Sequence, residues 1–381
     1  MTNRMIPVNE PVLSSKATTY VLDCLNTGWI SSQGSYIERF ETAYAKRLGI
    51  RHAITASSGT AALHLAVASL DIKAGDEVIM PDLTIISCPL AVIYTGATPV
   101  FVDVDPVTFT IDPNRIEAKI TKRTRAIMVV HLYGHPCDMD PIMTLAKKYK
   151  IAVIEDAAEA HGALYLPAGK VSKGKPVGTI GTIGVYSFYA NKIVTTGEGG
   201  MVMTNNTHLA TRVRLLKNLS HSPKRRFWHE HIGFNYRLTN ISAAIGLAQL
   251  ESIQTYIDKK KWMAKEYAKA LKGIPYLTLP TSQPWAQSVY WMYALTLTKN
   301  APISKNTLRM RLKKKDIDTR DFFYPLHTQP ILQKFVKKGS RFPVSDFASA
   351  HGFYVPSGLA ITKEQILMVA SALKELLTKT S

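Results

Sequence analysis

Cysteine is scarce in this chain of 381 residues, which has only three: Cys24, Cys88 and Cys137. They are widely spaced and form no Cys-x-x-Cys pair, so the sequence indicates neither a disulfide framework nor a zinc site. Long apolar runs are lacking too, since a run such as Ala126–Leu132 has the length of a strand and not of a membrane span. Met1–Pro7 also lacks the apolar core of a signal peptide. These absences predict a reduced, cytoplasmic protein with no membrane partner.

Acidic residues are few relative to basic ones: 28 Asp and Glu stand against 47 Lys and Arg, which gives a formal net charge of +19. Such an excess is typical of proteins that bind nucleic acid, because Lys and Arg neutralise phosphates. The basic clusters are scattered, however, and no helix-turn-helix, zinc-finger or aromatic RNA-binding motif accompanies them. We therefore expect no nucleic-acid partner, and a basic nucleic-acid-binding regulator is the alternative from another functional class. The clusters are Lys147–Lys148, Lys224–Arg226, Lys259–Lys261, Lys313–Lys315 and Lys337–Lys338.

What the sequence does contain is a regular alternation of short apolar runs and helical patterns from about residue 50. This alternation predicts an α/β fold with a mostly parallel sheet flanked by helices. Ligands of such sheets bind at the carboxyl ends of the strands. The predicted strands are His52–Ala56, Glu77–Met80, Pro99–Val104, Arg125–Leu132, Ile151–Glu155 and Gly200–Met203, with helices at Thr60–Leu70 and Asp140–Tyr149.

The pattern changes after residue 240. Ile241–Lys272 predicts one long helix, Tyr290–Thr298 a strand and Lys363–Leu377 a last helix. We place a domain boundary near residue 255, with a large N-terminal domain over residues 1–255 and a smaller C-terminal α+β domain over residues 256–381.

Two titratable residues point to one kind of cofactor. Asp156 directly follows the predicted strand Ile151–Glu155, and Lys192 precedes the glycine-rich stretch Thr196–Gly200. A lysine amine can bond covalently to an aldehyde cofactor, and a carboxylate can keep a pyridine nitrogen protonated. Alone, such an Asp is more often a helix cap and such a Lys a solvated charge. Together they are what pyridoxal phosphate (PLP) chemistry requires.

A third requirement, a phosphate site, is met by Ala56–Ala61, which reads Ala-Ser-Ser-Gly-Thr-Ala. This stretch joins a predicted strand to a helix, so its backbone N–H groups form an anion site to which the hydroxyls of Ser58 and Thr60 add donors. In isolation a simple N-cap is the commoner interpretation. Because the stretch precedes Asp156 and Lys192 in the same chain, the joint pattern is far more specific than its parts.

From about Ile6 to the C-terminus the sequence resembles the DegT/DnrJ/StrS family of sugar-nucleotide aminotransferases. The resemblance implies a fold-type I PLP-dependent transferase that passes an amino group from glutamate to a nucleotide-linked 4-keto-6-deoxy sugar. It favours GDP-4-keto-6-deoxymannose, with UDP- or dTDP-4-keto-6-deoxyglucose as alternatives. The matching stretches are Trp29–Ser32, Ser58–Leu65, Gly75–Ile79, Gly96–Asp103, His131–Met139, Ile154–Glu159, Asn191–Lys192, Thr195–Gly200, Gly233–Asn240 and Ala243–Leu250.

The resemblance also implies roles for single residues. Lys192 would carry the cofactor and move protons, Asp156 would pair with the pyridine nitrogen, and Glu159 would approach the ring hydroxyl. Asn235 would reach the phosphate from a neighbouring subunit, which makes a homodimer the expected unit. Ile85 stands where relatives place an aromatic side chain against the ring. The residues that match phosphate contacts are Ser58, Gly59, Thr60 and Ser187.

Trp29, Tyr324 and His327 fall in stretches that line the sugar pocket of relatives, and we expect them to bind substrate. Singly, packed aromatic rings and a surface histidine are also reasonable interpretations of these residues. Some relatives have His in place of the lysine and are dehydratases, so the retained Lys192 favours transamination. It also disfavours a catalytically silent member of the fold. No metal is expected.

Overall fold

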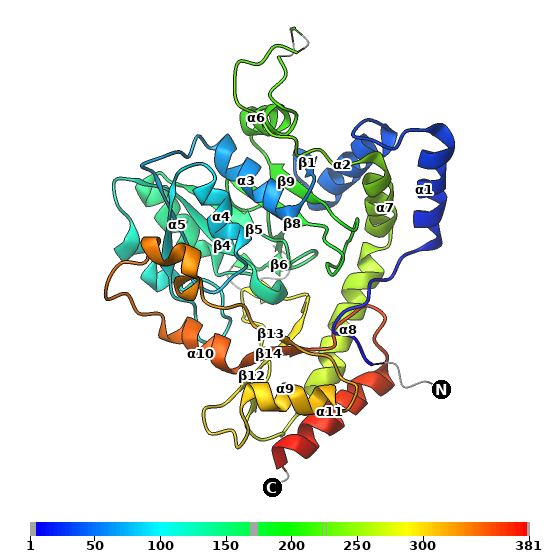
Figure 1. Ribbon diagram of the computed structural model, residues 1–381, viewed down its shortest axis with the longest axis vertical. Coiled ribbons are helices and arrows are strands. Elements are labelled where there is room, and N and C mark those ends of the chain that lie inside the picture. Colours follow the sequence, from blue (N-terminus) through cyan, green and yellow to red (C-terminus); the bar gives the residue numbers. More distant parts are fainter. Residues whose placement is uncertain (1–4, 168–173, 223, 226, 379–381) are drawn as a thin grey trace.

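A seven-stranded sheet forms the centre of the molecule (Figure 1). The computed structural model describes residues 5–167, 174–222, 224–225 and 227–378, which leaves Arg226 of one basic cluster outside the described part. The strand order is β1-β9-β8-β5-β4-β2-β3, and neighbours from β3 to β8 run parallel. The predicted α/β fold with a mostly parallel sheet is confirmed. The strands are β1 His52–Ala56, β2 Glu77–Pro81, β3 Thr98–Val102, β4 Thr124–Val130, β5 Ala152–Asp156, β8 Ile183–Ser187 and β9 Gly200–Thr204.

Strand β9 is the exception in direction, because it pairs antiparallel with both β1 and β8. Its first residue, Gly200, therefore lies opposite Ala56 and Ser187, the last residues of β1 and β8. The sequence patterns miss β8 altogether. Its sequence, Ile-Gly-Val-Tyr-Ser, interrupts the apolar run with a glycine and a hydroxyl, although all of its residues are buried.

Helices cover the sheet, and α3 is the one that matters most for the site. Its sequence is apolar all round, and residues from Ala61 to Val67 are buried between the sheet and other helices. The hydroxyl of Ser58 caps its first turn by accepting a hydrogen bond from the Ala61 N–H. The helices of this region are α1 Ser15–Thr27, α2 Ser35–Leu48, α3 Gly59–Ser69, α4 Ser87–Ile93, α5 Met139–Tyr149, α6 Thr207–Lys217 and α7 Asn240–Glu251.

The single helix expected over Ile241–Lys272 is wrong, because two helices occupy this stretch. Helix α7 ends at Glu251, and α8 runs from Ile253 to Leu271. Ser252 between them has φ −103° and ψ 3°, which lies outside the helical region, and its N–H donates a hydrogen bond of 3.1 Å to the carbonyl of Gln249. The apolar pattern runs through the break because α7 packs against α1 and α2 while α8 packs against the C-terminal helix.

The C-terminal part is built on a four-stranded antiparallel sheet with the order β10-β12-β14-β13. Apolar side chains of α8 from Met263 onward form a second core with this sheet and α11. Val289 and Trp291 belong instead to the core of the large sheet, so the boundary near residue 255 stays a proposal. The elements are β10 Leu277–Thr278, β12 Tyr293–Leu297, β13 Arg320–Asp321, β14 Gly352–Val355, α9 Lys305–Lys313, α10 Pro343–His351 and α11 Lys363–Thr378.

A small third sheet has the order β11-β6-β7, with β6 at Leu164–Tyr165, β7 at Lys175–Pro176 and β11 at Ala286–Gln287. Within the described ranges, no helix combines the length and the apolar character that crossing a membrane requires.

Candidate active site

A cavity of about 370 Å³ opens at the carboxyl ends of β1, β5 and β8. This is the edge of a parallel sheet at which ligands bind. The structure brings to its walls residues that lie far apart in the sequence, contributed by loops after these strands and by the start of α3. The predicted site residues that line it are Ser58, Gly59, Thr60, Ile85, Asp156, Glu159, Ser187 and Lys192.

Lys192 presents a buried amine to this cavity. Its Nζ lies 3.5 Å from Oε1 of Glu159, whose Oε2 accepts a hydrogen bond of 2.9 Å from the Tyr133 N–H. Burial lowers the pKa of the Lys192 amine, while the carboxylates of Glu159 and Asp156 act to raise it. Burial likewise raises the pKa of Glu159. A lysine whose pKa is lowered can act as a base more readily than a solvated one.

Asp156 ends β5 and is almost completely buried. Its Oδ1 accepts a hydrogen bond of 3.0 Å from the Ala158 N–H, and its Oδ2 accepts one of 3.1 Å from the thiol of Cys88 on α4. Burial raises the pKa of Cys88 well above its usual range, and the neighbouring Asp156 adds to this, so the thiol keeps its proton and donates it. These two donors fix the orientation of a carboxylate that faces the cavity.

The start of α3 is packed tightly against the end of β8. A Cβ atom on Gly59 would lie 2.7 Å from Cβ of Ser187, and one on Gly200 would overlap the carbonyl oxygen of Ser58. Beside them the hydroxyls of Thr60 and Ser87 are 2.8 Å apart. Backbone N–H groups of a helix start, surrounded by hydroxyls and kept open by glycines, form a cradle for a phosphate group.

The residues present fit PLP. An amine, a buried carboxylate and an anion cradle surround one cavity, and these are the partners that an aldehyde, a pyridine nitrogen and a phosphate need. Ile85, just before α4, is 39% exposed and adds an aliphatic wall. Over the part of the chain that the structure describes, no cluster of three His, Cys, Asp or Glu side chains could hold a metal ion.

Three predicted residues lie elsewhere on the surface and do not line the cavity. The side chain of Trp29 is 54% exposed, and its carbonyl accepts a hydrogen bond of 2.7 Å from Asn240. Tyr324 is 65% exposed. Asn235 is exposed, and its Oδ1 accepts a hydrogen bond of 2.9 Å from Arg237 Nε. None of them meets Lys192 within its own chain.

His327 is also absent from the walls of the cavity. Its Nδ1 lies 2.7 Å from Oδ2 of Asp82, and its Nε2 lies 3.3 Å from Oδ1 of Asp346. The imidazole stacks on Phe342 with the ring centroids 4.7 Å apart. In this structure the polar atoms of the ring are therefore engaged by two carboxylates.

Sequence reasoning missed an aromatic wall that comes from the C-terminal half of the chain. Trp291, Phe323 and Tyr354 line the cavity opposite the strand ends. They lie about a hundred residues or more after Lys192 and carry no motif, so no signal in the sequence could have placed them there. Tyr189 and Asn191 also line the cavity, and the segment that contains Lys192 could have suggested them.

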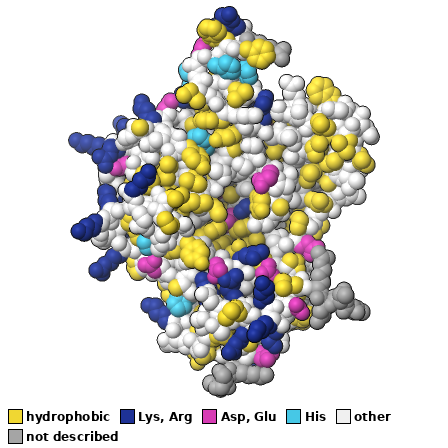
Figure 2. Space-filling model, viewed as in Figure 1, with side chains coloured by type: hydrophobic (Ala, Val, Ile, Leu, Met, Phe, Trp, Pro, Cys, Tyr) yellow, Lys and Arg dark blue, Asp and Glu magenta, His cyan; other side chains and the backbone are white. Residues whose placement is uncertain are grey.

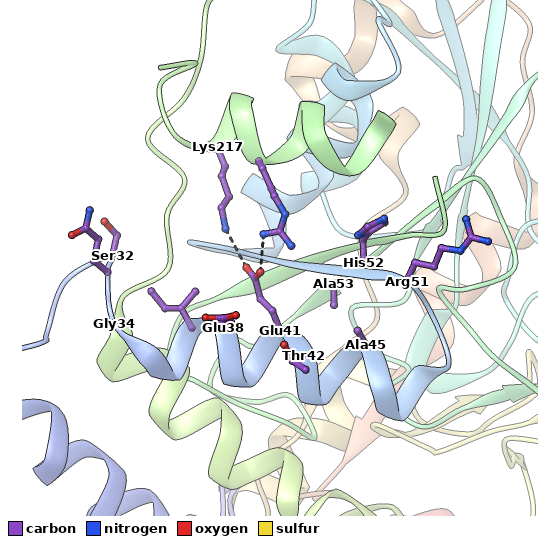
Figure 3. Close-up of a pocket in the computed structure, with 13 residues that line it drawn as sticks. Ser32, Gly34, Glu38, Glu41, Thr42, Ala45, Arg51, His52, Ala53 and Lys217 are labelled. Atoms are coloured by element: carbon purple, nitrogen blue, oxygen red, sulfur yellow. Dashed lines mark hydrogen bonds and ion pairs between the residues drawn. The ribbon is translucent and has the colours of Figure 1, made fainter. Parts of the chain in front are cut away.

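A second cavity, of about 470 Å³, lies beside α2 and β1 (Figure 3). Glu41 projects from α2 towards Lys217 and Arg214 of α6, at 3.3 Å and 2.8 Å. The Glu41 carboxylate also accepts hydrogen bonds of 2.8 Å from the N–H and the hydroxyl of Thr55. Because the nearly buried Glu41 and Lys217 pair with each other and the half-exposed Arg214 adds a second partner, this cluster is a structural tie between α2, β1 and α6.

Comparisons with known proteins agree with this geometry. A profile of the DegT/DnrJ/EryC1/StrS aminotransferase family matches residues 11–374. The chain is 44% identical to GDP-perosamine synthase of Escherichia coli O157:H7 and 41% identical to GDP-perosamine synthase of Caulobacter vibrioides, with 98% of both chains covered in each case. Among solved structures, S. venezuelae DesV in complex with a ketimine intermediate matches with a TM-score of 0.91 at 32% identity, over 99% of this chain and 100% of that chain. The chain therefore belongs to the DegT/DnrJ/EryC1/StrS family and is a PLP-dependent sugar aminotransferase.

Proposed function

We propose that this enzyme transfers an amino group from glutamate to C4 of GDP-4-keto-6-deoxymannose, which gives the 4-amino sugar GDP-perosamine. The observation that carries the chemistry is the meeting of Lys192, Asp156 and the start of α3 at one cavity. The choice of sugar is supported by the names of relatives that are 38–44% identical to this chain over nearly their full length.

Lys192 is the residue to which we assign the proton transfers. Bound PLP supplies an electron sink for the carbon that gains or loses the amino group. The Lys192 amine is buried, and burial lowers its pKa, so it can take a proton at one carbon and return it at another. Glu159, 3.5 Å away, keeps the amine on the side of the cavity that Asp156 also faces.

The other polar residues of the cavity would bind and orient the cofactor. Asp156 would pair with the pyridine nitrogen, because its carboxylate is already oriented by Cys88 and the Ala158 N–H. Glu159 would lie near the ring hydroxyl, and Ile85 would pack on the ring by dispersion. The phosphate would be held by Ser58, Gly59, Thr60 and Ser187.

The substrate would enter from the exposed side of the site. Trp29 and Tyr324 stay proposed substrate contacts, and their exposed rings are accessible to a nucleotide or a sugar. His327 stays a proposed substrate contact as well. Because Asp82 and Asp346 already engage its two ring nitrogens, the substrate would have to compete with one of these carboxylates for the imidazole.

We further propose a homodimer in which Asn235 reaches the phosphate site of the partner subunit. The segment between α6 and α7, which contains Asn235, projects from the body of the molecule (Figure 1). It carries Trp228, which is 50% exposed, and Ile232, which is 85% exposed. Hydrophobic side chains also gather over α1 (Figure 2), where Leu22 and Leu25 are exposed. Exposed apolar groups of this size are typical of surfaces that another chain covers.

The test is an assay of the purified protein with PLP and glutamate on three separate keto sugars, linked to GDP, UDP and dTDP, with mass spectrometry of the products. We expect the GDP-linked sugar to gain an amino group. Turnover of a UDP- or dTDP-linked sugar alone would overturn the proposed substrate. Lys192→Ala should lower the rate by roughly 10²-fold to 10⁴-fold or more, because it removes a positioned acid–base group.

A separate measurement tests the assignment of the lysine. The purified protein should be yellow, and borohydride should bleach it and leave the cofactor attached to the peptide that contains Lys192. Attachment to a different peptide would contradict the assignment.

A further inference from the structure

The Lys192 amine has a second neighbour that the proposed chemistry does not use. Its Nζ lies 3.8 Å from the centroid of the Trp291 ring, so the amine stands over the face of the indole. The same Nζ lies 3.5 Å from Oε1 of Glu159. Lys192 is thus held between a carboxylate and an aromatic face, and these two groups lie far apart in the sequence.

Trp291 is fixed in place from several directions. Its indole N–H donates a hydrogen bond of 2.7 Å to the carbonyl of Asn191, the residue before Lys192. Its own carbonyl accepts a hydrogen bond of 2.8 Å from Lys260 Nζ, which is fully buried. Tyr133 stacks on the ring at an interplanar angle of 14°. The ring therefore cannot turn away from the lysine without breaking contacts on each of its sides.

The backbone at Trp291 is just as closely fitted. Gly134, with φ +90°, packs against this backbone. A Cβ atom on the glycine would lie 2.9 Å from the backbone nitrogen of Trp291. Gly134 follows Tyr133, whose N–H holds Glu159. One turn of the chain thus sets the position of both groups that contact the Lys192 amine.

An indole face attracts a cation through its quadrupole, and the attraction is strongest where water is excluded. A neutral amine has no charge to interact in this way. The ring therefore favours the protonated form of Lys192, and it does so only while the amine is not bonded to the cofactor. Resting on the proposed function, we propose that Trp291 is a positioning residue, which holds the protonated Lys192 amine beside the reacting carbon between its two proton transfers.

Other charged and titratable groups also face Lys192, and they must be equal in all variants that are compared. Asp156 and Glu159 raise its pKa, whereas burial lowers it. His161, behind the site, is kept neutral by burial, with a pKa of about 3. Tyr189, Glu198 and Tyr354 line the same cavity. A substitution of Trp291 changes the identity of none of these side chains, and Trp291→Phe and Trp291→Leu both lose the indole N–H, so the difference between these two variants reports on the aromatic face.

The experiment uses the full-length protein loaded with pyridoxamine phosphate, so that Lys192 is a free amine. Trace acetylation with acetic anhydride across pH, followed by mass spectrometry of the Lys192 peptide, gives the pKa of that amine. Wild type, Trp291→Phe and Trp291→Leu are compared. The pKa should fall in that order, with Trp291→Leu lower by about one pH unit, a tenfold change in the protonation equilibrium.

The chain offers a matched control. Lys259 Nζ lies 3.8 Å from the ring centroid of Trp262 on α8, the same distance as in the Lys192–Trp291 pair. Trp262→Leu should leave the pKa of Lys192 unchanged. In steady-state assays Trp291→Leu should lower kcat about tenfold with little change in the KM for the sugar, because the amine and not the substrate has lost a contact.

An unchanged pKa of Lys192 in Trp291→Leu would overturn the proposal, and so would an equal fall in Trp262→Leu. If Trp291→Leu does not fold, Trp291→Phe is measured alone: its weaker aromatic face should give a smaller fall, and an unchanged pKa would overturn the proposal. The acetylation needs no turnover. Failure of every keto sugar in the assay would therefore refute the proposed function and leave this measurement valid.

Discussion

His327 Nδ1 lies 2.7 Å from Oδ2 of Asp82, and the His327 N–H donates to Oδ1 of the same carboxylate at 2.9 Å. Asp82 follows the last residue of β2 and is completely buried, and its carbonyl accepts a hydrogen bond of 2.7 Å from the Leu326 N–H. One aspartate thus binds the C-terminal part of the chain to the carboxyl edge of the large sheet by side chain and backbone together.

Asp82→Ala should lower the free energy of unfolding by about 3 kcal/mol, because it leaves two partly buried donors of residue 327 without their buried acceptor. Urea denaturation measures the loss. Asp346→Asn is the control, since Asp346 contacts the other side of the same ring but is largely exposed. That variant should cost less than about 1 kcal/mol. Equal losses would show that Asp82 has no special role as a tie.

Gly200→Ala should weaken PLP binding at least roughly tenfold, or about 1.4 kcal/mol. The added Cβ would overlap the carbonyl oxygen of Ser58, a backbone atom that cannot rotate aside, so the cradle at the start of α3 must shift. A titration of the protein with PLP, followed by absorbance, gives the affinity. Unchanged affinity together with an unchanged circular dichroism spectrum would show that this contact does not shape the phosphate site.

Glu41→Gln should lower the free energy of unfolding by roughly 3–5 kcal/mol, because it leaves Lys217 buried without its carboxylate. The double variant Glu41→Gln with Lys217→Met should recover most of this loss. Although burial acts to raise the pKa of Glu41, Lys217 and Arg214 bring it below the ordinary value of 4.5. The stability that ionised Glu41 contributes is therefore complete above about pH 4.5 and is lost as the pH falls through its lower pKa in the folded protein. The difference between wild type and Glu41→Gln should shrink accordingly in acid.

Lys260 gives a pH dependence of the same sign at higher pH. Burial lowers its pKa from 10.5 to about 7, so between these values the unfolded chain binds more protons than the folded one. The free energy of unfolding of wild type minus that of Lys260→Met should therefore rise with pH across this window, by up to about 1.4 kcal/mol per pH unit. Below pH 7 this difference should not change with pH. Urea denaturation at pH 6 to 9.5 measures it, with Lys265→Met on the exposed side of α8 as the control for the substitution. Parallel curves for wild type and Lys260→Met would contradict the prediction.

The sequence predicts the site best where chemistry follows the end of a strand. Ser58 and Asp156 lie at or just beyond the ends of apolar runs, and the rule for parallel sheets places both at one edge. Lys192 could not be predicted in this way, because the strand before it, β8, has no uninterrupted apolar run. It became a candidate only in combination with the phosphate turn and the carboxylate. The resemblance to a family then supplied Glu159, Ile85 and Ser187, all of which the structure brings to the cavity.

What could not be predicted depends on tertiary packing. Trp291 reaches Lys192 because α8 and its buried Lys260 carry the C-terminal part of the chain back to the sheet, and no local pattern encodes that path. The position of His327 depends on an aspartate 245 residues earlier. The break at Ser252 is hidden because both helices continue the same apolar periodicity while packing on different partners.

The reversed direction of β9 has a mechanical consequence for the lysine. Since β9 pairs back along β8, Ser187 and Gly200 lie side by side, and the loop that carries Lys192 is tethered at both ends. Inside it, the Phe188 N–H bonds to Gly199 at 2.8 Å and the Thr196 N–H bonds to Phe188 at 2.9 Å. The backbone of this loop cannot swing as a flap. The travel of the catalytic amine is therefore limited to rotations of its own side chain, a reach of a few bonds, and each turnover begins and ends with the amine at the same point.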